Sequence, residues 1–408
     1  MAEDPTYVIV GASLAGAKAA AGLREAGFEG RVLLVGEERD RPYERPPLSK
    51  DYLKGAADRD KIFVHDEGWY VEHHVELMLG ATVTGLHRDA RQVELAGGER
   101  LPYDKLLLAT GSVPRRLSLP GGDLEGVHYL RRVGESEAIR DALTSGGSLV
   151  VVGGGWIGLE VAAAGRHYGA SVTVIEPQPT PLYAVLGREV GEIFAALHRE
   201  HGVDLRLGSG VTAFEGEGGR VTGVVTSDGE TVPADAVVVG VGIVPNTRLA
   251  EAAGLEVDNG VVVDELLRSS DPDIYAAGDV ANAFNPLLRA RLRVEHWANA
   301  SNQGKAAGQS MAGHGEPYAK LPYFYTDQYD LSMEYHGWVG PDGYDDVVLR
   351  GDPASGEWLA FWLYGGRVLA GMNVNVWDQS DPIKRLARER AAVDRARLAD
   401  PAVPLDSL

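Results

Sequence analysis

Two glycine-rich turns, each lying between an apolar run and a helix-forming segment, organise this chain. The more complete turn follows the apolar run Val150-Val-Val152 and contains Gly153, Gly155 and Gly158 in the spacing G-x-G-x-x-G. This order predicts a strand, a tight turn and a helix whose N-terminus can hold a pyrophosphate. An ordinary strand-to-helix turn is the alternative, because glycine-rich turns are common.

The segment after this turn favours the dinucleotide interpretation. A second apolar run, residues 171–175, ends at Glu176. A carboxylate at the end of that second strand can accept hydrogen bonds from a ribose 2′-hydroxyl and would repel a 2′-phosphate. We therefore expect NADH rather than NADPH at this turn.

A second copy of the pattern opens the chain. Residues 7–10 predict a strand, Gly11 to Gly16 the turn, residues 17–26 the helix and residues 31–35 the next strand, with Glu37 at the ribose position. Ser13 stands where the middle glycine is usual, and its hydroxyl could bond a phosphate oxygen. Two fingerprints imply two dinucleotides, typically one held permanently and one exchanging.

Composition excludes several classes of function. The 408 residues are 44% hydrophobic and 24% charged, as in soluble globular proteins, and no apolar run approaches the roughly 18 residues that span a bilayer. The first strand begins near Tyr7, which leaves no room for a signal peptide, so we expect a cytoplasmic protein. A net charge of -20 argues against nucleic acid as a partner.

The chain contains no cysteine. It therefore has no disulfide, thiolate metal site, cysteine-ligated iron–sulfur cluster or thiol redox relay of its own. Reductases and peroxidases that work through a cysteine are excluded. His65, His73 and His74 lie close in sequence, but no cysteine or well-spaced carboxylate completes a metal site, and we expect none.

Cationic and small residues mark candidate ligand contacts in the first part of the chain. The loop Arg41-Pro-Tyr-Glu-Arg-Pro-Pro-Leu-Ser-Lys50 is rich in proline, and Arg45 and Lys50 could face a phosphate or a flavin edge. A solvated loop is the alternative. The buried strand that precedes Ala109-Thr110-Gly111 ends in a turn of small residues that admits a ligand closely.

Two further features lie beyond residue 270. Asp279 stands at the tip of a short strand, where it could cap a helix or contact the ribityl or phosphate-adjacent groups of a flavin. Arg289, Arg291 and Arg293 alternate with smaller residues and form a local exception in an acidic chain. A solvated strand face is the alternative for these arginines.

The pattern predicts an α/β fold with two Rossmann-like dinucleotide-binding domains and a C-terminal α+β domain. The first would comprise residues 1–113 and 246–319, and the second residues 114–245. Beyond residue 320 the β-α-β order stops, and antiparallel pairs are expected around Gly343, Gly351 and Gly365, followed by a basic helix over residues 382–398.

The motifs taken together resemble the two-dinucleotide-binding flavoprotein reductases. Within that group the whole chain is similar to the putidaredoxin-reductase type of ferredoxin reductase, which serves Rieske dioxygenases and bacterial cytochromes P450. The motifs that carry this resemblance are Pro46-Pro-Leu-Ser-Lys50, Tyr129-Leu-Arg131, Gly153-Gly-Gly-Trp-Ile-Gly-Leu-Glu160, Ala253-Gly-Leu-Glu-Val-Asp-Asn-Gly260 and Thr326-Asp-Gln-Tyr329.

The resemblance implies two sets of site residues. FAD would contact Gly11, Ser13, Ala15, Gly16, Glu37, Arg45, Lys50, Val83, Ala109, Thr110, Gly111, Arg131, Asp279 and Trp297. NADH would contact Gly153, Gly155, Ile157, Gly158, Glu160, Glu176 and Gly242.

The resemblance also implies the catalytic pair and the electron acceptor. Lys50 would stabilise negative charge on reduced flavin, while Glu160 holds Lys50 and leaves it when nicotinamide docks; a purely structural ion pair is the alternative. Electrons would pass from NADH through FAD to an acidic [2Fe–2S] ferredoxin docked near Arg289, Arg291 and Arg293.

Two positions depart from the family pattern. Tyr325 stands where many relatives have tryptophan, and Trp297 stands where the best-known members have a smaller residue. These changes leave open an NADH-dependent reductase of a small acceptor, such as a quinone or the monodehydroascorbate radical. A redox-sensing protein similar to apoptosis-inducing factor is the third interpretation.

Overall fold

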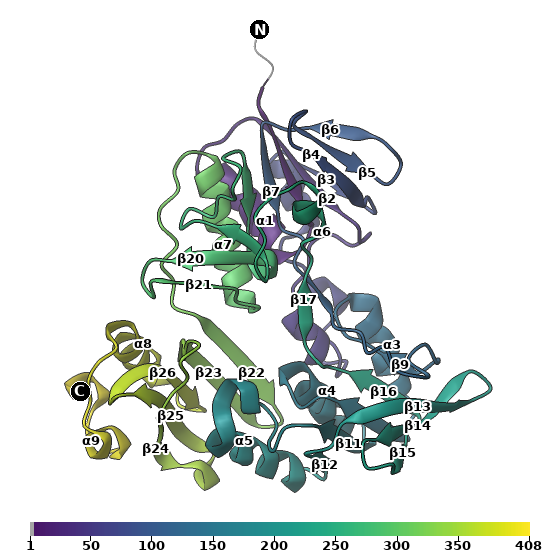
Figure 1. Ribbon diagram of the computed structural model, residues 1–408, viewed down its shortest axis with the longest axis vertical. Coiled ribbons are helices and arrows are strands. Elements are labelled where there is room, and N and C mark those ends of the chain that lie inside the picture. Colours follow the sequence, from purple (N-terminus) through teal and green to yellow (C-terminus); the bar gives the residue numbers. More distant parts are fainter. Residues whose placement is uncertain (1–3) are drawn as a thin grey trace. The chain divides into compact units, whose positions relative to one another are not determined.

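The computed structural model describes residues 4–408, which form two compact units (Figure 1). The first unit comprises residues 4–44, 60–113 and 244–323, and the second comprises residues 45–59, 114–243 and 324–408. The three-domain boundaries drawn from the sequence are finer than this division and stay a prediction.

A five-stranded parallel sheet in the order β19-β7-β1-β2-β3 forms the centre of the first unit. Its strands are β1 (Thr6–Val10), β2 (Arg31–Gly36), β3 (Val75–Leu79), β7 (Lys105–Leu108) and β19 (Ile274–Ala276). The strands expected at residues 7–10 and 31–35 are confirmed. Parallel strands buried on both faces require continuous apolar runs, as in β1 and β7.

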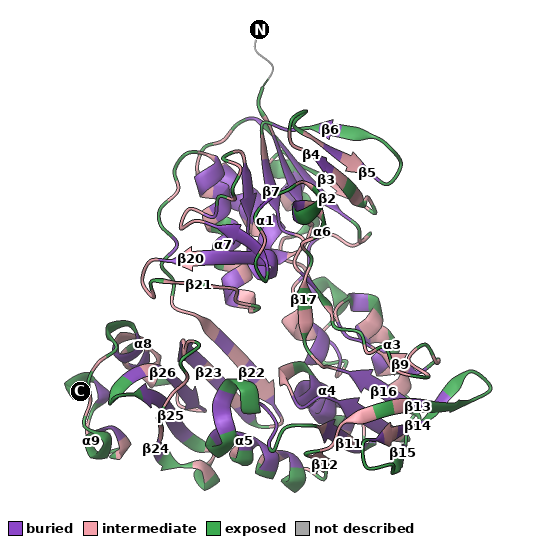
Figure 2. Ribbon diagram, in the orientation of Figure 1, coloured by how far each residue is buried: buried purple, intermediate pink, exposed green. Residues whose placement is uncertain are grey.

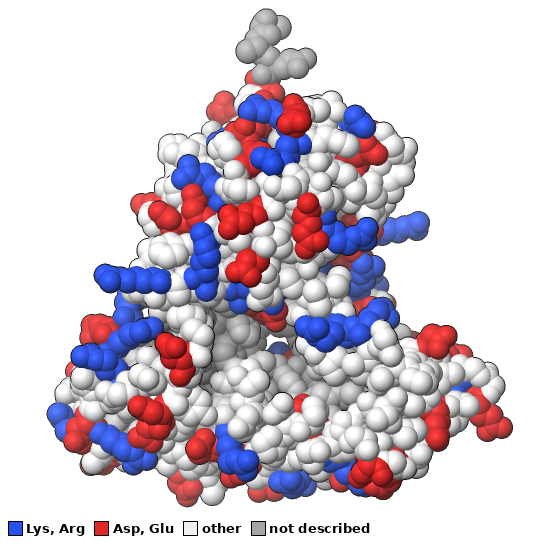
Figure 3. Space-filling model, viewed as in Figure 1, with Lys and Arg blue, Asp and Glu red and all other residues white. Residues whose placement is uncertain are grey.

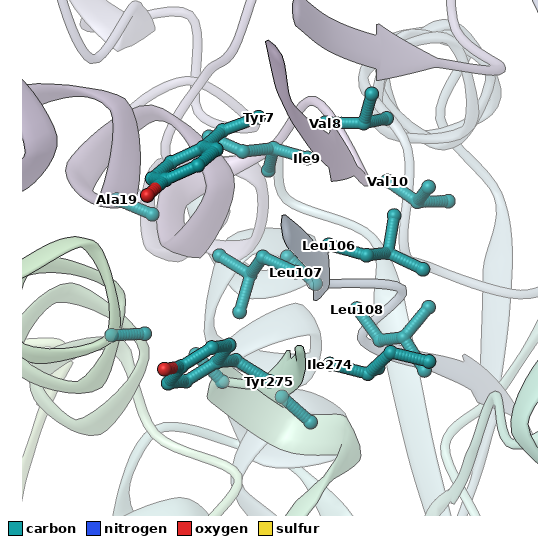
Figure 4. Close-up of a cluster of buried hydrophobic side chains, with 14 of the residues drawn as sticks. Tyr7, Val8, Ile9, Val10, Ala19, Leu106, Leu107, Leu108, Ile274 and Tyr275 are labelled. Carbon is teal, nitrogen blue, oxygen red and sulfur yellow. The ribbon is translucent and has the colours of Figure 1, made fainter. Parts of the chain in front are cut away.

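The core of this unit lies on both faces of the sheet. Figure 4 shows side chains alternating along β1, β7 and β19, because successive residues of a strand point to opposite faces. The register pairs Ile9 with Leu107 and Leu107 with Tyr275, so these side chains share one face. All three are buried.

Helices and small sheets complete the first unit, and Figure 1 shows α1 beside α7. The helices are α1 (Leu14–Glu25), α2 (Glu67–Glu72), α6 (Arg248–Ala252) and α7 (Trp297–Met311). One three-stranded sheet contains β4 (Val83–His87), β5 (Gln92–Leu95) and β6 (Arg100–Pro102). Another contains β18 (Val261–Val263), β20 (Ala281–Asn285) and β21 (Ala290–Leu292). Two short strands, β8 (Ser112–Pro114) and β17 (Ile243–Pro245), pair with each other.

The second unit repeats the parallel arrangement, with strand order β12-β11-β10-β16-β9. Its strands are β9 (Val127–His128), β10 (Ser148–Val152), β11 (Ser171–Glu176), β12 (Asp204–Leu207) and β16 (Ala236–Val239). The connecting helices are α3 (Val133–Thr144), α4 (Trp156–His167) and α5 (Tyr183–Glu200), and an antiparallel sheet contains β13 (Val211–Glu217), β14 (Arg220–Thr226) and β15 (Thr231–Pro233). The strands expected at residues 150–152 and 171–175 are confirmed.

The last sheet of the chain has five strands in the order β22-β23-β26-β25-β24. Its pairs β23–β26, β26–β25 and β25–β24 are antiparallel. Its strands are β22 (Tyr323–Gln328), β23 (Leu331–Gly337), β24 (Asp346–Asp352), β25 (Glu357–Tyr364) and β26 (Arg367–Val374). Gly365 lies in the β25–β26 turn as expected. The pairs expected around Gly351 and Gly343 are wrong, because Gly351 lies within β24, and Gly343 joins β23 to β24, which are not neighbours in the sheet. The α+β character expected beyond residue 320 is confirmed.

The single basic helix expected over residues 382–398 is wrong. The segment forms α8 (Ser380–Glu389) and α9 (Arg395–Ala399). Arg390, directly after α8, adopts a left-handed conformation with φ of 46°, and Ala392 forms a β-bridge with Arg367. Pairing with the end of the sheet therefore interrupts a segment whose composition favours one helix.

Burial follows this layered plan within each unit. Figure 2 shows the central strands buried and the outer helix faces and hairpin tips exposed. In the second unit, Leu186, Val190 and Phe194 of α5 pack with Trp358 and Trp362 of the antiparallel sheet in one apolar cluster. Among residues 4–408, none of the helices combines the length and the apolar character that crossing a membrane requires.

Candidate functional site

The two glycine-rich turns share one backbone geometry. Gly11 and Gly153 have φ of +119° and +104°, a region that favours glycine. A Cβ on Gly11 would lie 2.1 Å from the carbonyl oxygen of Ala109, and one on Gly153 would lie 2.5 Å from that of Gly240. The small-residue turn at Ala109 therefore packs directly on the first fingerprint.

The helices that follow the turns begin in the same way. A Cβ on Gly16 would lie 2.1 Å from the Gly11 carbonyl oxygen, and one on Gly158 would lie 2.1 Å from the Gly153 carbonyl oxygen. Neither α1 nor α4 has an acidic residue in its first turn. The first-turn N–H groups of both helices can therefore point at an anionic pyrophosphate without carboxylate repulsion from that turn.

Ser13 is the N-cap of α1 and fits the turn without strain. Its φ of -126° lies in the extended region that any residue adopts, and Gly155, the N-cap of α4, is also extended. The middle position therefore does not need glycine for its conformation, and a serine hydroxyl is accommodated there.

Both acidic residues lie at the ends of second strands. Glu176 is the last residue of β11, and Glu37 directly follows β2 and is exposed. Each strand pairs in parallel with the strand that leads into its glycine-rich turn. This is the arrangement in which a carboxylate reaches the ribose of a dinucleotide.

The remaining flavin candidates of the first unit lie on different elements. Asp279 is inside the 3₁₀ helix Gly278–Val280, whose N-cap is Ala277, so a helix-capping role for Asp279 is wrong. Its carboxylate is buried and accepts a 2.7 Å hydrogen bond from the Ser112 hydroxyl. Thr110 donates to the Asn246 carbonyl oxygen at 2.8 Å. The other two positions are Val83, the first residue of β4, and Trp297, the first residue of α7.

Arg45, Lys50 and Arg131 belong to the second unit. Arg45 precedes the 3₁₀ helix Pro46–Ser49, and its guanidinium donates to the carbonyl oxygen of Arg131. The proline-rich loop therefore packs against the segment before α3. It is not the purely solvated loop that the sequence left as the alternative.

The Lys50–Glu160 pair is the buried charged centre of the second unit. The Lys50 ammonium donates to Glu160 Oε1 at 2.7 Å, and the two residues are 9% and 5% exposed. The Thr326 hydroxyl donates to the same oxygen at 2.6 Å, and the Ser49 hydroxyl donates to Glu160 Oε2. The ring centroid of Tyr325 lies 5.4 Å from the Lys50 ammonium, a cation–π distance.

The NADH candidates cluster at the carboxyl ends of β10 and β16. Ile157, in the first turn of α4, is 36% exposed. Gly242 follows β16 and is exposed with φ of +97°. These positions are accessible next to the glycine-rich turn, as a ligand contact requires.

Sequence reasoning missed Ser49 and Thr326 as partners of Glu160. Both residues stand in motifs that carry the family resemblance, but nothing in their spacing indicates a shared partner. Only the structure shows that Thr326 and Gln328, at positions i and i+2 of β22, are both completely buried. Buried polar side chains on one strand face indicate a hydrogen-bonded network.

The histidines noted in the sequence pack against aromatic rings. His65 stacks on Trp69 with ring centroids 4.0 Å apart, and His73 stacks on the same indole at 4.3 Å. Burial lowers the pKa of His65 to about 4. Within residues 4–408, no group of three or more histidine, aspartate or glutamate residues is arranged to hold a metal ion.

Comparison with known proteins gives two family matches that together cover almost the whole chain. The family described as pyridine nucleotide-disulphide oxidoreductase matches residues 5–304, and the family described as reductase C-terminal matches residues 323–408. The boundary between the matches falls just before β22.

Individual relatives match over nearly their full length. Rhodocoxin reductase of Rhodococcus erythropolis is 42% identical over 370 residues, which cover 91% of this chain and 86% of that protein. The ferredoxin--NAD(+) reductase component of the anthranilate 1,2-dioxygenase system of Burkholderia cepacia is 41% identical over 409 residues, covering 99% of both. The reductase chain in the covalent putidaredoxin reductase–putidaredoxin complex matches with a TM-score of 0.95 at 38% identity, covering 99% of this chain and 98% of that chain.

Proposed function

Because the chain belongs to the pyridine nucleotide-disulphide oxidoreductases and, among them, to the putidaredoxin-reductase type of ferredoxin reductase, we propose that it carries FAD and passes electrons from NADH to a ferredoxin. The observation that carries this proposal is the presence of two complete dinucleotide-binding turns, each with its own acidic residue at the end of the next parallel strand. A chain without cysteine cannot use the disulfide chemistry in the family's description.

The first fingerprint fits FAD. The close approach of Ala109 to Gly11 leaves no room for a Cβ at the turn, and the first turn of α1 lacks acidic residues, so an anionic pyrophosphate can approach the backbone N–H groups. Glu37 would bond the adenosine ribose. The other residues assigned to FAD are Arg45, Lys50, Val83, Thr110, Gly111, Arg131, Asp279 and Trp297.

The second fingerprint fits NADH, with Glu176 on its ribose and Ile157 and Gly242 beside the turn. When bound, FAD would accept the hydride of NADH and allow its two electrons to leave singly. Each NADH then reduces two ferredoxins and releases one proton. Lys50 supplies positive charge where the flavin becomes anionic, and Glu160 holds that ammonium in place.

We assign the electron acceptor as an acidic [2Fe–2S] ferredoxin that docks near Arg289, Arg291 and Arg293. Arg289 and Arg291 are exposed, although Arg291 also donates to the Val263 carbonyl oxygen at 2.7 Å. Arg293 has a side chain only 11% exposed and forms an ion pair with Glu295. The first two arginines therefore carry the docking charge, and Arg293 contributes less.

The charge distribution makes local cations important for docking. On the face shown in Figure 3, lysine and arginine side chains are interspersed with aspartate and glutamate. The net charge of -20 repels an acidic partner at long range, so association depends on where cations gather.

The deciding experiment is NADH-driven cytochrome c reduction with and without a panel of acidic [2Fe–2S] ferredoxins. Strong stimulation by at least one ferredoxin is expected. Fast NADH oxidation with quinone or ferricyanide and no response to any ferredoxin would instead indicate a small-acceptor reductase, with Tyr325 and Trp297 as the first residues to exchange. Slow flavin reduction with an NADH-dependent change of oligomeric state would indicate a redox sensor. The cytoplasmic location expected from the sequence stays a prediction.

A further inference from the structure

Glu160 receives hydrogen bonds from three separate donors. Ser49 donates to Oε2, whereas Lys50 at 2.7 Å and Thr326 at 2.6 Å donate to Oε1. The carboxylate is nearly excluded from solvent. Because a buried carboxylate depends on donors supplied by the protein, the loss of any of the three should change how firmly it is held.

A line of polar groups leads from Thr326 away from this carboxylate. Gln328, on the same face of β22, donates from Nε2 to Thr326 Oγ1 at 3.3 Å. The Gln328 Oε1 atom lies 2.8 Å from Nε2 of His198, on α5. An amide oxygen only accepts hydrogen bonds, so His198 carries its hydrogen on Nε2.

Tyr329 completes the line on the other side of the imidazole. Its hydroxyl lies 3.1 Å from His198 Nδ1, the ring nitrogen that remains to accept. Burial lowers the pKa of His198 to about 4, so the ring is neutral at pH 7. From Tyr329 through His198 and Gln328 to Thr326, each donor therefore points toward the Glu160 carboxylate.

We propose that Thr326 is the positioning residue that keeps Glu160 in place, and that the line from Tyr329 fixes the Thr326 hydroxyl as its donor. This inference rests on the proposed function, in which Lys50 and Glu160 act beside the flavin. Glu160 is tied to Ser49 and Thr326 as well as to Lys50. Lys50 is consequently the member of the pair that changes partner when nicotinamide docks, in contrast to the expectation that Glu160 leaves.

The burial of this line supports a specific role. Thr326, Gln328 and His198 are all completely buried, where β22 and α5 contribute to one apolar cluster. A buried polar line avoids the cost of unsatisfied groups only when every member finds a partner, and here each member does. The line therefore fixes the orientation of the Thr326 hydroxyl, which stands at its end.

Charged and aromatic groups lie at both ends of the line. Lys50 is the cation that contacts Glu160, and the Tyr325 ring faces that ammonium from β22. At the far end, the neutral His198 contacts Tyr329, on which His201 stacks.

The test compares Thr326→Val, Thr326→Ser and Thr180→Val in the full-length, FAD-loaded protein. Valine preserves shape without the hydroxyl, and serine restores the hydroxyl. Thr180 is a matched control because it is 2% exposed and its hydroxyl has no partner within residues 4–408. Single-turnover reduction of the flavin by saturating NADH is measured from pH 5 to 9.

For Thr326→Val we expect a roughly tenfold slower reduction, because Glu160 loses one of its three donors. Thr326→Ser and Thr180→Val should stay within about twofold of the unchanged protein. A Thr326→Val protein with an unchanged rate overturns the proposal. Equal losses in Thr326→Val and Thr180→Val would mean that Thr326 only packs, and would also overturn it.

A second readout does not depend on activity. Nitrogen-15 NMR of labelled histidine reports the tautomer of each ring, and the signals of His198 are assigned by their absence in His198→Gln. We expect the Nε2–H tautomer at pH 7 and a changed Nε2 environment in Gln328→Met. An Nδ1–H tautomer would contradict the direction of the line.

The two readouts distinguish this proposal from the proposed function. If NADH does not reduce the flavin in the unchanged protein, the proposed function fails and the tautomer still tests the line. If ferredoxin reduction is fast but Thr326→Val matches the unchanged protein, the function stands and the positioning role of Thr326 is refuted.

Discussion

The Glu176 carboxylate accepts a 2.6 Å hydrogen bond from the backbone N–H of Gly154. The acid at the end of β11 is therefore attached to the glycine-rich turn that it follows by more than twenty residues. Its other oxygen accepts from the N–H of Gln178 at 2.8 Å. A carboxylate offers about four acceptor positions, so capacity remains for the hydroxyls of a ribose.

This arrangement predicts the cofactor preference. Glu176→Gln removes the negative charge while keeping an oxygen that can accept from the turn. We expect the ratio of kcat/KM for NADH over NADPH to fall about tenfold or more, since repulsion of the 2′-phosphate is lost. Glu37→Gln, at the other fingerprint, should leave this ratio unchanged. An equal ratio in Glu176→Gln and the unchanged protein would refute the role of Glu176.

The ion pair predicts separable effects on stability and rate. Lys50→Met leaves the Glu160 carboxylate buried without its cation, which should lower the free energy of unfolding by about 3–5 kcal/mol. We expect FAD to bind but to be reduced by NADH at least about tenfold more slowly. The double variant Lys50→Met/Glu160→Gln should recover stability without recovering the rate. Full FAD content with a normal reduction rate in Lys50→Met would show that the pair is only structural.

The exposed arginines predict the salt dependence of ferredoxin turnover. Charge reversal in Arg289→Glu/Arg291→Glu should raise the KM for an acidic ferredoxin and flatten its dependence on ionic strength, because favourable long-range attraction is removed. Arg188→Glu/Arg220→Glu, at exposed sites in the second unit, is the matched control. The measurement is steady-state kinetics at several salt concentrations. Unchanged kinetics in Arg289→Glu/Arg291→Glu would show that the ferredoxin does not dock at these arginines.

The break in α5 predicts a large stability effect at Gly187. This residue has φ of 79° and ψ of -173° inside the helix, and a Cβ there would lie 1.6 Å from the Tyr344 hydroxyl oxygen. Gly229 also has a positive φ, of +86°, but has nothing within 4 Å of its Cβ position. Urea unfolding should show a loss of about 1–2 kcal/mol for Gly229→Ala, and at least about 3 kcal/mol for Gly187→Ala. Equal losses in the two variants would mean that the Tyr344 ring moves away from the added Cβ at little cost in stability.

The buried imidazole of His198 predicts how stability changes with pH. Burial lowers the pKa of His198 in the folded chain to about 4 from the ordinary value of 6.5. The unfolded chain therefore binds the proton first, and the stability that His198 contributes, present above pH 6.5, is lost as pH falls toward 4. The loss amounts to about 3 kcal/mol. Urea unfolding between pH 4 and 7.5 should show a weaker pH dependence in His198→Phe than in the unchanged protein. The exposed His314→Phe is the control, and parallel profiles for all three proteins would contradict the prediction.

The elements that were predicted correctly are those with local signals. Residues 150–158 combine an apolar run, glycine spacing and a helix-forming segment, and each of these depends on neighbours in sequence. The helix over residues 382–398 also had a local signal, but Arg390 adopts a left-handed conformation and Ala392 pairs with Arg367. There, contact with a distant strand outweighed helix propensity.

The sequence by itself determined the two dinucleotide-binding folds, their acidic residues and the absence of thiol chemistry, because strand periodicity, glycine spacing and composition are properties of short segments. Only the tertiary structure decided which donors hold Glu160. Ser49 is 111 positions from it and Thr326 is 166 positions from it. No short-range pattern encodes such a contact, because it exists only once a 3₁₀ helix, α4 and β22 have packed together.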